Sequence, residues 1–86
     1  MSNNYILLDG IIRQGLNLMR QPNTSEKQFR VWVENSKNLL GIISNKNPII
    51  LTNYLNVVVA ATNPHFTPSQ RLSMCLRYLI EIQPVI

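Results

Sequence analysis

Apolar and polar positions follow the period of an α-helix through the first part of the chain. In the stretch Asn3–Arg20 apolar residues recur three or four positions apart, which predicts an amphipathic helix. Gly10 and Gly15 lie inside it, and each lowers helix stability by roughly 1 kcal/mol. They either admit a closely packed neighbouring helix or divide the segment in two. The polar residues of this stretch share the opposite side of the expected helix: Asp9, Arg13, Asn17 and Arg20.

The segment from Ser25 to Ile43 carries the clearest helix signal. Ser25 and Gln28 have the spacing of a capping box, in which each side chain accepts a hydrogen bond from the other residue's backbone, and Thr24 is the alternative N-cap. Trp32 lies inside the apolar stripe that follows, so we expect a core residue; the alternative is a hot spot of a binding surface. The stripe has helical spacing: Phe29, Trp32, Val33, Ser36, Leu39, Leu40 and Ile43.

The stretch from Pro48 to Ala61 is apolar in almost every direction around a helix. Asn47 is the expected N-cap, and Pro48 suits the first helical position. Three consecutive valines, Val57–Val59, favour a strand, whereas the length of the stretch and its Asn-Pro start favour a helix. We expect a helix. Only a narrow polar edge interrupts it: Thr52, Asn53 and Asn56.

A second capping box opens the last segment. Thr67 is the expected N-cap, Pro68 takes the first helical position, Gln70 closes the box, and Pro84 ends the helix. No linker or repeat separates the segments, and 86 residues suit one domain. The sequence therefore predicts an all-α protein, a small bundle of about four helices that spans residues 1–86 as a single helical domain.

The composition points to association with other molecules. Charged residues make up 14% of the chain, against about 25% in an ordinary domain, so its surface repels neighbours weakly. The net charge of +4 suggests nucleic acid as an alternative partner. The eight basic residues are spread along the chain rather than gathered in a basic arm, so nucleic acid is not the expected partner.

Groups that could carry out catalysis are sparse. One cysteine and one histidine cannot make an internal disulfide or a structural zinc site, and three isolated glycines do not form a phosphate loop. A nucleophilic Cys75 with His65 as its base is an alternative, but Cys75 stands among apolar residues, where a cysteine is usually part of the core. We therefore expect no enzyme, no catalytic, cofactor-binding or metal-binding residues and no cofactor.

No segment predicts a signal peptide or a membrane span. Asp9 and Gly10 interrupt the apolar stretch near the amino terminus. The apolar run 49–61 is shorter than the ~18 residues that a spanning helix needs. A cytoplasmic location, with no membrane partner, is the expectation that follows.

Two stretches, Phe29–Leu40 and Pro68–Ile82, resemble small helical accessory domains of bacterial, anti-phage defence-associated proteins. The shared pattern is a Phe-x-x-Trp helix ending in Leu-Leu, followed later by a helix that begins Pro-x-x-Arg-Leu. The resemblance covers about a third of the chain and implies an adaptor that recruits or assembles a partner. It is carried by Phe29, Trp32, Leu39, Leu40, Arg71, Leu72, Leu76 and Leu79.

A helix-turn-helix is a further alternative for the last two segments. In that arrangement the turn Asn63–Phe66 would join them, and the start of the final helix would face the major groove of DNA. The match is weak, because the turn contains proline and no glycine and the preceding helix is unusually apolar. The residues concerned are Ser69, Gln70, Arg71 and Ser73.

The expected function is that of a non-enzymatic protein-interaction module: an adaptor, an assembly subunit or a small inhibitor of bacterial or phage origin. Residues 48–61 carry no charge and more apolar positions than three neighbouring helices can cover. We expect this segment to form a homo-oligomer or bind a protein partner, with nucleic acid as the alternative. The candidate partner-binding residues are Tyr54, Val57, Val59 and Arg71.

Overall fold

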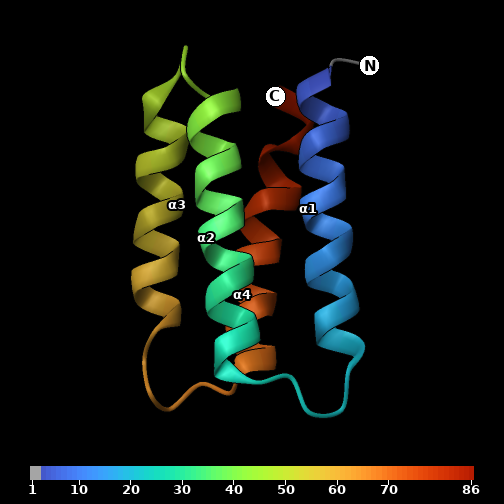
Figure 1. Ribbon diagram of the computed structural model, residues 1–86. Helices are drawn as coiled ribbons and strands as arrows, with labels where there is room; N and C mark the ends of the chain where they lie inside the picture. Colours follow the sequence, from blue (N-terminus) through green and yellow to red (C-terminus); the bar gives the residue numbers. More distant parts are fainter. Residues whose placement is uncertain (1–2) are drawn as a thin grey trace.

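Helices account for most of the computed structural model, which describes residues 3–86 (Figure 1). The all-α prediction is confirmed, and the valine triplet lies in a helix rather than a strand. The two glycines do not divide the first helix. The elements are α1 (Asn3–Arg20), α2 (Glu26–Ile43), α3 (Pro48–Ala61), α4 (Pro68–Ile82) and the short 3-10 helix η1 (Gln83–Val85).

The four helices run alternately up and down, as short connections between consecutive helices require. Each helix packs against the one before and after it in the chain, and α4 closes the bundle by packing against α1. Helices α1 and α3 stand at opposite corners and do not contact each other. The α1–α2 and α3–α4 connections therefore share one end of the bundle, and the α2–α3 connection lies at the other (Figure 1).

Both predicted capping boxes are present. The backbone N–H of Gln28 donates to the Ser25 hydroxyl at 3.1 Å, and the backbone N–H of Ser25 donates to the Gln28 side chain at 2.9 Å. Thr67 and Gln70 make the same reciprocal pair at 3.2 and 2.8 Å. Thr24, the alternative cap, instead donates its hydroxyl to the carbonyl oxygen of Leu18. The capping-box bonds satisfy backbone N–H groups that a helix leaves unpaired at its start, and the Thr24 bond satisfies a carbonyl oxygen near the end of α1.

The start of α3 differs from the expectation. Pro48 does take the first helical position, but the Asn47 side chain forms no capping hydrogen bond. Pro48 has no N–H to satisfy, and its fixed φ already suits a helix. The proline therefore marks this helix start without the polar cap that the sequence suggested.

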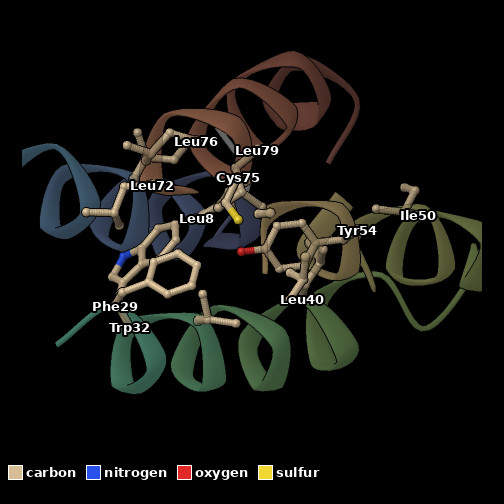
Figure 2. Packing of buried hydrophobic residues seen from close by; sticks show 14 of the residues in the cluster. Leu8, Phe29, Trp32, Leu40, Ile50, Tyr54, Leu72, Cys75, Leu76 and Leu79 are labelled. Atoms are coloured by element: carbon tan, nitrogen blue, oxygen red, sulfur yellow. The ribbon is translucent and has the colours of Figure 1, made fainter. Parts of the chain in front are cut away.

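The core draws large side chains from all four helices (Figure 2). Trp32 is 3% exposed, which confirms the core interpretation, and its Nε1 donates to the Ile11 carbonyl oxygen at 2.9 Å. Gly15 makes room for the ring, because a Cβ there would lie 2.7 Å from the Trp32 indole and 2.8 Å from Leu76. Helices α1, α2 and α4 thus meet at one glycine.

Candidate interaction surface

Cys75 is buried in the core beside the hydroxyl group of Tyr54 (Figure 2). Figure 2 shows its sulfur next to the Tyr54 hydroxyl, which lies 2.6 Å from the Ser36 hydroxyl. Ser36 in turn donates to the Val33 carbonyl oxygen at 2.7 Å. Burial raises the pKa of Cys75 to about 11 and also raises the pKa of Tyr54. The thiol therefore stays protonated at neutral pH, whereas a nucleophilic cysteine needs a thiolate.

The raised pKa of Cys75 predicts a loss of stability in alkaline solution. The unfolded chain releases the thiol proton near the ordinary pKa of 9.0, whereas the folded chain holds it to about 11. Ionisation thus favours the unfolded state, and the free energy of unfolding should fall by about 2–3 kcal/mol between pH 9 and 11. Urea denaturation across this range measures the loss. Cys75→Ala should show a shallower decline from pH 9 upward, and parallel curves for the two proteins would contradict the assignment.

His65 and the carboxylates of residues 3–86 do not form a metal-ion site. His65 is exposed in the α3–α4 connection, where its backbone N–H donates to the Asn63 side chain at 2.9 Å. Within residues 3–86 no three His, Cys, Asp or Glu side chains gather in a way that could hold a metal ion. Across the same residues, no helix combines the length and apolar character needed to cross a bilayer.

Tyr54, the first candidate partner-binding residue, is a core residue. Its side chain is 0% exposed, and its ring stacks on Tyr78 with 5.8 Å between the centroids. Tyr78 in turn donates its hydroxyl to the Ile50 carbonyl oxygen at 2.8 Å. A partner cannot reach Tyr54 while the bundle is folded, so the expectation for this residue was wrong.

Arg71 was also expected to bind a partner, and this expectation was wrong too. Its side chain is buried at the start of α4, with 8% of its surface exposed. Its guanidinium pairs with Glu26 of α2 at 3.1 Å and donates to the Asn63 carbonyl oxygen at 3.3 Å. The guanidinium carbon also lies 5.9 Å from the centre of the Phe29 ring. Arg71 therefore joins α2 to the α3–α4 connection, and it cannot face DNA as the helix-turn-helix alternative required.

The two candidate valines of α3, Val57 and Val59, fall on different sides of the helix. Val57 is half-buried against the core, whereas Val59 is 71% exposed. Ile49 and Leu55 accompany Val59 on the exposed side, at 60% and 40%. We call this surface the α3 outer face, and its exposed residues are Pro48, Ile49, Thr52, Asn53, Leu55, Asn56, Val59 and Ala60.

The α3 outer face carries no charge. Between Lys46 and Arg71 the only Asp, Glu, Lys, Arg or His side chain is His65, which lies beyond the end of the helix. A solvated helix face normally carries charged side chains. Exposed apolar residues on an uncharged helix are typical of the centre of a protein–protein interface.

Sequence reasoning missed Ile49 and Leu55, although a signal for them was present. The polar edge of residues 52, 53 and 56 marks the outward side of the helix, because buried amides without partners are costly. On a helix, Ile49 lies about 20° from Asn56 and Val59 about 20° from Thr52, so both share the exposure of that edge, whereas Leu55 lies about 60° from Thr52. Tyr54 falls on the other side and was therefore identifiable as core.

Comparison with protein-family models, with curated proteins and with solved structures finds no match to this chain. Its function is therefore argued from its own surface.

Proposed function

We propose that this protein is a non-enzymatic protein-interaction module that pairs with a second copy of itself through the α3 outer face. The observation that carries the proposal is the exposure of Ile49, Leu55 and Val59 on a helix without charge. Water around such side chains is released when another apolar surface covers them. The same face would serve an adaptor, an assembly subunit or a small inhibitor.

A second copy is the occupant that the charge distribution favours. The chain has a net charge of +4, so pairing two identical surfaces brings like charges together unless the paired surface is neutral. The α3 outer face meets this condition along its whole length. Closed two-fold dimers are also the commonest way for one protein to cover such a face.

The interface expected from one helix is small. Helix α3 has 14 residues and is therefore about 21 Å long. A contact of this length falls at the low end of specific interfaces, where association is weak and transient. We therefore expect a dimer that forms and dissociates with concentration rather than an obligate one.

Val59→Lys should shift this equilibrium to the monomer without unfolding the bundle. The exposed position tolerates a lysine in the monomer, whereas in the dimer two lysines would meet near the interface. Light scattering during size-exclusion chromatography should give the wild type a mass approaching twice 9.9 kDa as concentration rises, and the variant a mass of 9.9 kDa. Thermal melts should confirm that the variant remains folded.

Ile80→Lys is the matched control, because Ile80 is an exposed apolar residue of α4 on the side facing α1. It should leave the dimer intact. A wild-type protein that remains a monomer at roughly millimolar concentration would contradict the proposal. Equal loss of the dimer in both variants would show that added charge, rather than the α3 outer face, controls association.

The resemblance of α2 and α4 to accessory domains of anti-phage defence proteins supports an adaptor role in bacterial defence or phage counter-defence. Nucleic-acid binding is the second candidate, favoured by the net charge of +4. Proteins that bind single-stranded DNA or RNA also use exposed aromatic rings on which the bases stack. All six aromatic side chains of this chain are buried or half-buried, so the interaction module is the better supported proposal.

A further inference from the structure

The net positive charge is concentrated at one end of the bundle. Each carboxylate side chain forms an ion pair with one basic side chain: Asp9 with Arg13, Glu26 with Arg71, Glu34 with Lys37 and Glu81 with Arg77. The four other basic side chains have no carboxylate side chain within 4 Å in residues 3–86: Arg20, Lys27, Arg30 and Lys46. Three of them, Arg20, Lys27 and Arg30, are exposed where α1 ends and α2 begins (Figure 1).

A groove between α1 and α2 starts at this basic end. Its volume is about 430 Å³, which lies within the range of small binding sites. Leu18 and Val31 provide its accessible apolar surface, the buried Trp32 also lines it, and Lys27 is the only charged residue among its lining residues. An apolar groove beside unpaired cations is complementary to a ligand that combines an apolar group with negative charge.

The rim of the groove offers polar groups that are free to bind. The side chains of Gln14, Asn17 and Asn35 line it and form no hydrogen bond within the described residues 3–86. Gln28, in contrast, is held by the capping box and by a 3.3 Å hydrogen bond to Gln21. Three amides, each with donors and an acceptor, can therefore bond to a polar backbone or side chain placed in the groove.

We propose that the α1–α2 groove binds an acidic amphipathic helix from a protein partner. The lining residues of α2 run from Lys27 to Asn35, a distance of about 12 Å or two helical turns. That length accepts two apolar side chains four residues apart on the partner, the spacing of helix-in-groove recognition. The partner's Asp and Glu side chains then lie near Lys27, the charged residue that lines the groove, at the basic end of the bundle. This site is separate from the α3 outer face and does not depend on dimer formation.

A peptide fits this groove better than a nucleic acid does. Trp32 is 3% exposed with its indole N–H bonded to Ile11, so its ring presents no face on which a base could stack. The apolar surface instead calls for an aliphatic or aromatic side chain. The cations supply attraction to negative charge, which a carboxylate-bearing peptide satisfies.

Trp32 is the only tryptophan, so its indole N–H reports directly on the groove. The experiment titrates ¹⁵N-labelled protein with a panel of short helical peptides that carry Leu or Phe four residues apart and Glu at most other positions. We expect shifts in the Trp32 indole and in the side-chain amides of Gln14, Asn17 and Asn35, with dissociation constants of roughly 10–100 μM. The same panel with Lys in place of Glu should not bind.

Two charge reversals form a matched pair for this test. Lys27→Glu lies in the groove and Lys46→Glu at the other end of the bundle, and both change the net charge equally. We expect Lys27→Glu to weaken binding by about tenfold and Lys46→Glu to leave it within about twofold. Val31→Glu, at an exposed groove position, should also abolish the indole shift while the protein stays folded.

Several results would overturn the proposal. If Lys27→Glu and Lys46→Glu lost peptide affinity equally, the binding would depend on the net charge of the protein and not on the groove. Shifts confined to α3, or no shift with any acidic peptide at roughly millimolar concentration, would exclude the groove. Binding of an oligonucleotide such as single-stranded dT at this groove, without binding of the acidic peptides, would assign the basic end to nucleic acid instead.

Discussion

Replacement of Trp32 by alanine is expected to lower the free energy of unfolding by about 3–5 kcal/mol. The side chain is almost fully buried, fills the space above Gly15 and donates a hydrogen bond from Nε1 to Ile11. Alanine leaves a cavity that the surrounding helices cannot close completely. Small domains have total stabilities of only about 5 kcal/mol, the low end of the usual range, so the variant should be partly unfolded at room temperature. Urea titration followed by circular dichroism measures the loss.

Val31→Ala is the control for this experiment, because Val31 is the neighbouring residue of α2 and is exposed. Its effect should stay within about 0.5 kcal/mol. A Trp32→Ala protein with an unchanged melting temperature would show that the indole does not hold the bundle together. If such a protein also failed to bind its partner, Trp32 would belong to an interface instead of the core.

Alanine at the two glycines of α1 is expected to change stability in opposite directions. At Gly15 an added Cβ would stand less than 3 Å from the Trp32 ring and from Leu76, so the helices must move apart at a cost of about 2–3 kcal/mol. At Gly10 nothing lies within 4 Å of the added atom. Alanine there should raise stability by up to about 1 kcal/mol, because glycine is the poorer helix former.

The pair forms its own control, since both changes add the same methyl group to the same helix. Thermal and urea unfolding of both variants measure the two effects. A stabilised Gly15→Ala protein would contradict the close approach of α1, α2 and α4. An unstable Gly10→Ala protein would show that this part of α1 is covered by something, such as a second chain.

The helices and most of their ends could be predicted from the sequence because they depend on local interactions. Ser25 with Gln28 and Thr67 with Gln70 are three residues apart, and the sequence alone shows that their atoms can meet. The core role of Trp32 followed from periodicity for the same reason. Asn47 failed as a cap because Pro48 is sufficient to start the helix without it.

The candidate surface was harder to predict because it depends on contacts between distant segments. Arg71 pairs with Glu26, which lies 45 residues earlier in the chain, and no local sequence pattern indicates that pair. The orientation of α3 was only weakly marked in the sequence, because apolar residues surround the helix except at the polar edge of Thr52, Asn53 and Asn56. The packing of Tyr54 against Ser36 and Tyr78 fixes which side of α3 faces water.

The position of Arg71 has a consequence for how the bundle opens. The guanidinium contacts the first turn of α2, the Phe29 ring and the loop before α4. That loop cannot detach unless the hydrogen bond from Arg71 to the Asn63 carbonyl oxygen breaks or Arg71 leaves Glu26 and Phe29. Local openings usually begin at loops that lack such links. The link instead ties the α3–α4 loop and the start of α2 into one cooperative unit. Slow motions that expose backbone amides should therefore start at the opposite end, around the α2–α3 connection, where Asn47 leaves its helix uncapped.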